Sequence, residues 1–205
     1  MAGGCGGGTA SGKSTVVALV AKELGALVLG HDRYYIPPPK EIAEHPRRVF
    51  LHNYDEPLAF ENDLLAAHLA QLRLGRSVRV PSYDYATSTR NHRDEWEVVN
   101  PCPVVLVDGI LTLAPPGLRS MFNLKVFVDA PADVRLARRM RRDVALRGQS
   151  AADVVDQYLE KVRPMHDLHV QPQEHHADLV LDGMGEPSEL AARLAGRIRA
   201  WAGTS

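Results

Sequence analysis

The run Gly7-Gly8-Thr9-Ala10-Ser11-Gly12-Lys13-Ser14 decides the fold of this chain. It fits the pattern G-x-x-x-x-G-K-[ST], in which glycines let backbone N–H groups close around phosphate oxygens. Lys13 reaches the β- and γ-phosphates, and Ser14 offers a hydroxyl to Mg²⁺. The helix that starts here adds the positive end of its dipole. The run, together with Thr15 behind it, predicts a binding site for ATP.

The residues before this loop differ from the strand that normally precedes it. A buried parallel strand is usually rich in Val and Ile, whereas this segment reads Ala2-Gly3-Gly4-Cys5-Gly6. Glycine in a strand costs backbone entropy and packs poorly. Two explanations stay open at this point, a weak first strand or a strand that begins upstream of this sequence.

Composition limits the class of protein. With 205 residues, 45% of them hydrophobic, the chain is expected to form one domain over residues 1–205. The net charge of −1 argues against general nucleic-acid binding, and no apolar run reaches membrane-spanning length. Cys5 and Cys102 make no zinc or disulfide framework and no signal peptide precedes the loop, so we expect a cytoplasmic protein.

Apolar runs alternate with helical patterns along the chain. This order predicts an α/β fold with three layers, α/β/α, around a mostly parallel sheet. Polar residues between two apolar arms indicate a small β-hairpin excursion at about 78–99. The expected strands lie at 27–30, 104–108, 125–129 and 179–181, and the expected helices at 14–24, 61–74, 131–147, 150–162 and the C-terminal end.

Two acids stand at the carboxyl ends of predicted strands, where ligands bind in parallel sheets. Asp32 follows the strand at 27–30 and is a candidate for the base that accepts the proton of an attacking hydroxyl. Asp108 ends the strand at 104–108 and is a candidate Mg²⁺ ligand. Ser14, Asp32 and Asp108 are therefore the predicted metal environment. An ordinary turn or cap is the alternative for each acid.

An arginine-rich segment at about 133–150 is predicted to form a lid. Arg135, Arg138, Arg139 and Arg142 share one helix face, and Arg147 follows. Only Asp133 and Asp143 are present to neutralise the six arginines of 133–147. Arginine makes forked contacts with phosphate, so we expect the segment to close over ATP. An RNA-binding patch is the alternative.

Aromatic and histidine residues give weaker signals. Five tyrosines fall in predicted loops, where they either wall a pocket for a flat ring or pack the loops. The nine histidines lack the Cys or paired carboxylates of a zinc set, so we expect no metal role for them. The tyrosines are Tyr34, Tyr35, Tyr54, Tyr83 and Tyr85.

Taken together, these segments resemble the uridine kinases, also called uridine–cytidine kinases. The resemblance covers nearly the whole chain and is far more specific than the phosphate loop alone. Its motifs are Gly-Gly-Thr-Ala-Ser-Gly-Lys-Ser (7–14), His-Asp-Arg-Tyr-Tyr (31–35), Asn-Tyr-Asp-Glu-Pro-Leu-Ala-Phe (53–60), Pro-Ser-Tyr-Asp-Tyr (81–85), Asp-Gly-Ile-Leu (108–111), Arg-Asp-Val-Ala-Leu-Arg-Gly (142–148), Val-Arg-Pro-Met-His (162–166) and Ala-Asp-Leu-Val-Leu (177–181).

The resemblance implies transfer of the γ-phosphoryl group of ATP to the 5′-hydroxyl of uridine or cytidine, with Mg²⁺. It implies Asp32 as the base, Lys13 at the phosphates and Arg142 and Arg147 as lid contacts. It also implies a homo-oligomer, commonly a tetramer. The residues it assigns to the nucleoside are Asp32, Tyr35, Asp55, Tyr83, Tyr85, Ser88, Arg139, Gln149 and Gln157.

The chain departs from the family pattern mainly where the base is read. Ser88 stands where a larger side chain is usual, and Gln149 where an Arg is usual. Asp108 replaces a Glu, and Arg33 replaces a small polar residue. We therefore expect weak preference between uridine and cytidine. A kinase for a sugar phosphate, like phosphoribulokinase, and a nucleotide-sensing module without catalysis are the alternatives.

Overall fold

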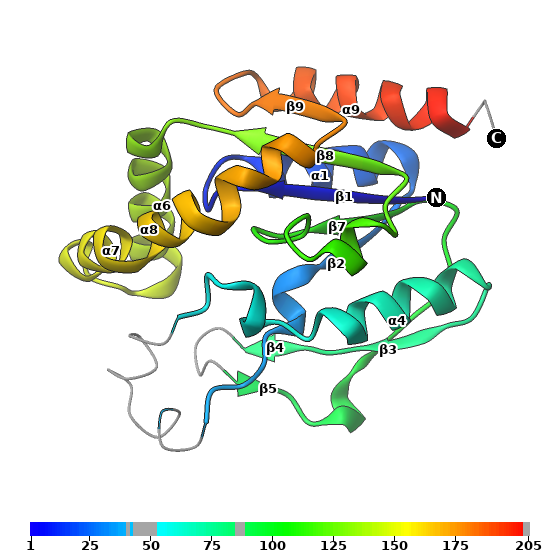
Figure 1. The fold of residues 1–205 in the computed structure, drawn as a ribbon, viewed down its shortest axis with the longest axis horizontal. Coiled ribbons are helices and arrows are strands. Elements are labelled where there is room, and N and C mark those ends of the chain that lie inside the picture. Colours follow the sequence, from blue (N-terminus) through cyan, green and yellow to red (C-terminus); the bar gives the residue numbers. More distant parts are fainter. Residues whose placement is uncertain (40–41, 43–52, 85–88, 203–205) are drawn as a thin grey trace.

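A five-stranded parallel sheet in the order β2-β7-β1-β8-β9 forms the middle layer of the structure (Figure 1). The structure, a computed structural model, describes residues 1–39, 42, 53–84 and 89–202. The predicted α/β architecture with a parallel sheet is confirmed. The strands are β1 (Ala2–Gly7), β2 (Leu27–Gly30), β7 (Val105–Asp108), β8 (Leu124–Asp129) and β9 (Leu179–Asp182).

The glycine-rich segment before the phosphate loop is the central strand of this sheet. All six residues of β1 are buried, and β1 pairs with β7 on one side and β8 on the other. A Cβ at Gly4 would lie 2.5 Å from the ring of Phe122, and a Cβ at Gly3 would lie 3.1 Å from Leu106. The glycines therefore leave room for side chains of neighbouring elements, and a strand does form within this sequence.

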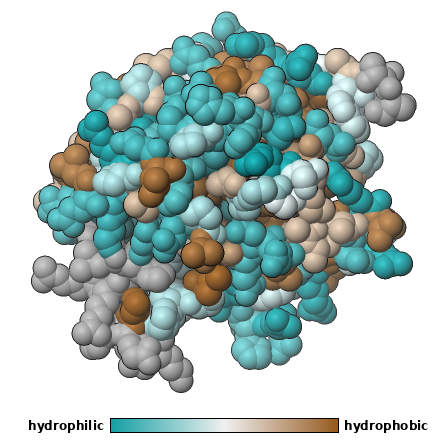
Figure 2. Space-filling model, in the orientation of Figure 1, coloured by the Kyte–Doolittle hydropathy of each residue, from teal (hydrophilic) through white to brown (hydrophobic). Residues whose placement is uncertain are grey.

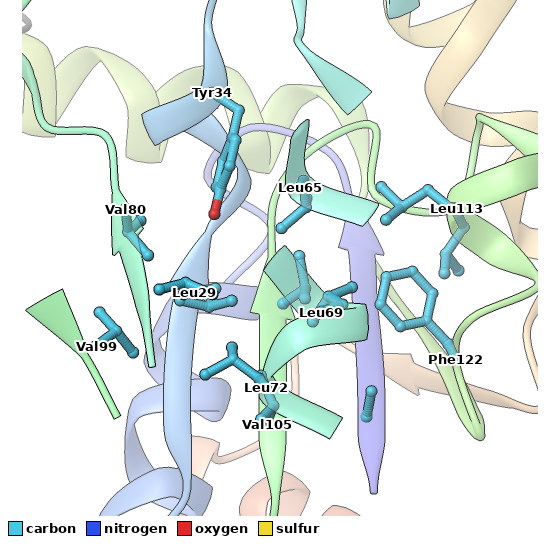
Figure 3. Packing of buried hydrophobic residues seen from close by; sticks show 14 residues of the cluster. Leu29, Tyr34, Leu65, Leu69, Leu72, Val80, Val99, Val105, Leu113 and Phe122 are labelled. Carbon is cyan, nitrogen blue, oxygen red and sulfur yellow. The ribbon is translucent and has the colours of Figure 1, made fainter. Parts of the chain in front are cut away.

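Helices cover both faces of the sheet. The helices α1 (Lys13–Leu24) and α9 (Pro187–Ala202) lie together on one face, and α4 (Asn62–Arg73) lies on the other (Figure 1). On the α4 face, Leu65, Leu69 and Leu72 pack as predicted against the sheet (Figure 3). The α9 face buries Leu190, Leu194 and Ile198 against α1, as the sequence period predicts.

The predicted excursion is present. The strands β3 (Val78–Val80) and β6 (Glu97–Val99) pair antiparallel, and β4 (Tyr83–Asp84) and β5 (Thr89–Arg90) form a second short pair. Val80 and Val99 join the core beneath α4 (Figure 3). Short segments complete this part of the chain: 3₁₀ turns at His31–Tyr34, Pro57–Ala59 and Arg93–Glu95, and the helix α5 (Pro116–Arg119).

The helical region after α6 (Ala132–Arg147) is longer than predicted. The sequence predicts a helix over 150–162, but helical turns continue to residue 176. Pro164 lacks an N–H and normally ends a helix, but here π turns on both sides of it accommodate the missing donor. The run consists of α7 (Ala151–Gln157), π turns at Tyr158–Val162 and His166–Val170, α8 (Arg163–Met165) between them and a 3₁₀ segment at Gln171–His176.

The strand arrows in Figure 1 point toward α6, α7 and α8, which gather beyond the carboxyl edge of the sheet. The face in Figure 2 is mostly hydrophilic, and its hydrophobic residues form separate small patches. Within the described part of the chain, no helix has the length and apolar character needed to cross a membrane.

The packing of β1 leads to a paired prediction. Gly4→Ala places a methyl group against the Phe122 ring, and such overpacking costs about 1–3 kcal/mol of unfolding free energy. The matched control is Gly196→Ala on α9, where a Cβ meets nothing within 4 Å. There the change should add up to about 1 kcal/mol through helix propensity. Urea unfolding measures both, and a Gly4→Ala protein as stable as the wild type contradicts the packing argument.

Candidate active site

Three strand ends bring Lys13, Asp32 and Asp108 together. Asp108 lies in register with Cys5 of β1 and Gly30 of β2, so it stands between these two strands. Asp32 follows Gly30 by two residues, in the first 3₁₀ turn. Lys13 is the first residue of α1 and is 7% exposed. The charges of both Lys13 and Asp108 act on Asp32, which places the three groups in one site.

The backbone of the phosphate loop requires glycine at two positions. Gly7 and Gly12 have φ angles of 143° and 101°, which side chains rarely adopt. A Cβ at Gly7 would also lie 2.4 Å from the carbonyl oxygen of Val128. The Ser11 N–H donates to the Gly8 carbonyl oxygen at 3.1 Å and closes a turn. Ser14 and Thr15 are exposed on the first turn of α1.

Asp32 and Asp108 each carry a buried carboxylate oxygen, Oδ1, that has no hydrogen-bond partner among the described residues. Burial raises the pKa of Asp32 to about 6; Lys13 and Arg147 lower it, while Asp108 and Asp55 raise it further. Unpartnered oxygens of this kind are the ligands that a hard cation prefers. The two acids therefore fit either a metal ion or a donor hydroxyl group.

Two buried side chains, Arg135 and His166, pack behind the phosphate loop, and the sequence did not predict this packing. Arg135 is 4% exposed and donates from Nε to the Ala130 carbonyl oxygen at 3.0 Å. A Cβ at Gly8 would lie 2.8 Å from Arg135 and 3.0 Å from His166. The His166 Nε2 pairs with Gln171 Oε1 at 2.8 Å, and burial followed by the Arg135 charge lowers its pKa. The glycine at position 8 was the one sequence feature that could have indicated these close neighbours, because a larger residue would leave no room for them.

The arginines of the predicted lid have partners that their spacing does not reveal, and closure of the segment over ATP stays a prediction. Arg135 packs behind Gly8 in the interior, and Arg138 donates to the Gly183 carbonyl oxygen at 2.9 Å. Three others, Arg139, Arg142 and Arg147, contact the fully buried carboxylate of Asp143. Spacing alone predicts a shared helix face but not which neighbouring elements cover that face.

Arg139 connects the loop to the residues assigned to the ribose. Its guanidinium donates to Thr9 Oγ1 at 3.3 Å and to Gln157 Oε1 at 2.6 Å. Burial raises the pKa of Asp55, and the Arg139 and Lys13 charges lower it. Arg139 therefore contacts Gln157 and lies close enough to Asp55 for its charge to act on that acid, and the contacts of all three residues with a nucleoside stay a prediction.

Aromatic rings gather next to Asp32. Tyr35 packs on Phe60 at 4.3 Å between ring centroids and lies 5.3 Å from Tyr54 and 5.4 Å from Tyr83. The His31 ring also stacks on Phe60, with 4.2 Å between the ring centroids. Tyr34 is different, because it is fully buried and its hydroxyl pairs with His68 Nδ1 at 2.9 Å (Figure 3). Loop packing is the correct interpretation for Tyr34.

Two arginines connect this aromatic segment to the β-hairpin excursion at about 78–99. Arg33 donates to the Pro81 carbonyl oxygen at 2.6 Å and pairs with Glu97 at 3.0 Å. Arg90 donates to the Tyr35 carbonyl oxygen at 2.6 Å and pairs with Glu61 at 2.7 Å. The unusual Arg33 therefore has a structural explanation, since it ties the turn that holds Asp32 to β3 and β6.

Gln149 follows the C-terminal cap of α6, and its side-chain Oε1 is buried without a hydrogen-bond partner among the described residues. Tyr85 and Ser88, both assigned to the nucleoside, lie outside the described residues. Among the residues that are described, no group of three or more His, Cys, Asp or Glu side chains could hold a metal ion.

Comparison with known proteins agrees with this geometry. Residues 3–188 match the model of the phosphoribulokinase / uridine kinase family. The chain belongs to this family. It is 42% identical over 203 residues to a uridine kinase of Chloroflexus aurantiacus, covering 96% of this chain and 93% of that one. It is 41% identical over 187 residues to a uridine kinase of Bacillus cereus, covering 89% and 85%. The predicted family resemblance is confirmed, and the chain is an ATP-dependent phosphotransferase.

Solved structures support the kinase fold at low identity. A putative fructose transport system kinase from Silicibacter superposes with a TM-score of 0.65 at 22% identity, covering 88% of this chain and 89% of that one. A possible uridine kinase from Bacillus stearothermophilus gives 0.62 at 17% identity, covering 89% and 88%. These similarities concern the fold alone, which is that of P-loop kinases.

The raised pKa of Asp32 predicts a pH-dependent stability difference. An acid whose pKa rises from 3.8 to about 6 on folding destabilises the fold once it is ionised. This destabilisation is absent below pH 3.8 and is complete above about pH 6. Asp32→Asn should therefore melt at a higher temperature than the wild type at pH 8, with the difference shrinking as the pH falls through 6. Equal melting temperatures at pH 8 contradict the buried position of the carboxylate.

Proposed function

We propose that this kinase transfers the γ-phosphoryl group of ATP to the 5′-hydroxyl of uridine or cytidine, with Mg²⁺. The observation that supports it most is the position of Asp32. Its carboxylate oxygen Oδ1 is buried without a hydrogen-bond partner among the described residues, and the charges of Lys13 and Asp55 both act on it. A base between a phosphate site and an acceptor site is what phosphoryl transfer to a hydroxyl needs.

Each group has a chemical role in this proposal. Lys13 and the backbone N–H groups of the loop bind and orient the β- and γ-phosphates. Asp32 accepts the proton of the attacking 5′-hydroxyl, and a pKa near 6 leaves it ionised at neutral pH. Arg142 and Arg147 stabilise negative charge on the phosphoryl group during transfer. Asp55, Arg139 and Gln157 hold the ribose hydroxyls, which fixes the 5′-hydroxyl near the base.

The residues present fit a magnesium ion. Asp32 and Asp108 supply buried oxygens without partners, and Ser14 supplies an exposed hydroxyl on α1. A bound Mg²⁺ would neutralise charge on the β- and γ-phosphate oxygens. The shorter reach of Asp108, compared with the Glu usual in this family, fits a contact through water.

A nucleoside acceptor is favoured over a sugar phosphate by the aromatic cluster. Tyr35, Tyr54, Tyr83 and Phe60 form a cluster of ring contacts in which Tyr54 and Tyr83 stay partly exposed, and a flat base packs on rings of this kind. The names of the relatives in Chloroflexus and Bacillus point the same way. We also propose that the protein is cytoplasmic and forms a homotetramer. Light scattering of the purified chain tests the tetramer.

The central prediction compares acceptors. With ATP, the wild type should release ADP in the presence of uridine or cytidine and not with ribulose 5-phosphate or without an acceptor. Asp32→Asn, which cannot accept the proton, should lower kcat about 10²–10⁴-fold and leave the KM for ATP nearly unchanged. A coupled ADP assay measures both. The matched control is Asp133→Asn, an exposed acid on α6.

Three results would argue against this function. Turnover only with ribulose 5-phosphate supports the sugar-phosphate alternative. ATP binding without acceptor-dependent turnover supports the nucleotide-sensing alternative. A change in the KM for uridine alone in Asp32→Asn makes Asp32 a binding residue rather than the base.

Base selectivity is a separate prediction. An amide both donates and accepts hydrogen bonds, so Gln149 can pair with either pyrimidine through its buried side chain. We expect kcat/KM for uridine and cytidine to differ by less than about tenfold, a factor that corresponds to about 1.4 kcal/mol. Gln149→Leu should lower both values together. Initial rates with each nucleoside measure the ratio, and a wild-type preference above about 10³-fold shows that another residue reads the base.

A further inference from the structure

One acid beneath the arginines of α6 has no role in the mechanism described so far. The Asp143 carboxylate is fully buried, with 0% of its side chain exposed. The Nε of Arg142 lies 2.7 Å from its Oδ1, the Nε of Arg139 lies 3.3 Å from its Oδ2, and Nη1 of Arg147 lies 3.5 Å from Oδ1. A buried carboxylate needs such partners to offset its loss of hydration.

Two of the three arginines also act on residues of the proposed reaction centre. Arg139 is 10% exposed and reaches Thr9 of the phosphate loop. Arg142 and Arg147 are 35% and 40% exposed, so they stand at the surface of the site above Asp143. The Arg147 charge also acts on Asp32. The groups that Asp143 holds therefore act on both the phosphate loop and the acid proposed as the base.

Two sets of hydrogen bonds allow Asp143 to fix the orientation of the Arg142 guanidinium and of the chain after α6. Arg142 binds it through both Nε and Nη2, at 2.7 and 3.3 Å, and a guanidinium held at two points has a fixed plane. The backbone carbonyl oxygen of Asp143 accepts from the N–H groups of Gly148 and Gln149, which closes the end of α6. The same residue thus sets the arginine planes and the start of the segment that carries Gln149.

We propose that Asp143 is a positioning residue for phosphoryl transfer, fixing Arg139, Arg142 and Arg147 where they stabilise the charge of the transferred group. The proposal rests on the proposed function. Without the carboxylate charge, three guanidinium groups stand close together with only the Asp55 charge on Arg139 to offset their repulsion, and they move away from one another. A displacement of about 1 Å in a reacting site can lower the rate about 10²-fold.

The test is a double-mutant cycle in kcat, normalised to folded protein by circular dichroism, with ATP and uridine. Asp143→Asn should lower kcat about 10²-fold, and Asp143→Glu should recover part of the loss because it restores the charge. Because Asp143 acts through its arginines, Asp143→Asn should cost much less in a background in which Arg142 and Arg147 are both replaced by Ala than in the wild type. Asp133→Asn, an exposed acid on the same helix, is the control and should keep the wild-type kcat.

A purely structural role gives different results. It lowers the melting temperature of Asp143→Asn but leaves kcat per folded molecule unchanged, or it gives losses that multiply when Asp143→Asn is combined with the two arginine changes, and either result overturns the proposal. If Asp143→Asn does not fold, the same cycle with Asp143→Glu decides, since its smaller loss should also fail to multiply. A wild type without uridine-dependent turnover refutes the proposed function itself, whereas an active wild type with multiplying losses refutes only the role of Asp143.

Discussion

Close approach of other groups to the backbone of residues 2–12 is the constraint on which the rest of the structure depends. Phe122 packs over Gly4, the Val128 carbonyl oxygen lies against Gly7, and Arg135 and His166 fill the space behind Gly8. A side chain at Gly4, Gly7 or Gly8 would require these neighbours to shift. The phosphate loop is thereby held between β8, α6 and the helical run before β9, and its N–H groups keep a fixed direction.

The acids at the carboxyl edge of the sheet lower the stability of the fold but are available for catalysis. Asp32 and Asp108 each keep one buried carboxylate oxygen that has no partner in the part of the chain the structure describes, and burial raises the pKa of Asp32. Such groups destabilise a fold unless a ligand or a metal completes them. The arginine cluster on α6 is the complementary case, because Asp143 offsets its charges in the unliganded chain. The site thus combines unpartnered acids with partnered arginines.

The sequence was most informative where local pattern and chemistry coincide. The phosphate loop, the strand that ends at Asp108 and the leucine face of α4 follow from spacing, and the structure confirms them. The glycine strand could not be decided, because the reason for its glycines lies in Phe122 and Leu106, far away in the sequence. Helix spacing placed the arginines of α6 on one face, but only the tertiary neighbours show that Arg135 packs behind Gly8 and that Arg138 donates to the carbonyl oxygens of Ser11 and Gly183. The helix predicted over 150–162 is too short, since helical turns continue past Pro164 with a π turn on each side of it.

A crystal structure of the chain with uridine and a non-hydrolysable ATP analogue tests the central claim most directly. The account predicts the triphosphate in the loop around Lys13, the base against Tyr35 and Tyr83, and the 5′-hydroxyl within about 2.6–3.2 Å of an Asp32 carboxylate oxygen, the reach of a general base. A complex in which the 5′-hydroxyl points away from Asp32, with another side chain in its place, would contradict it.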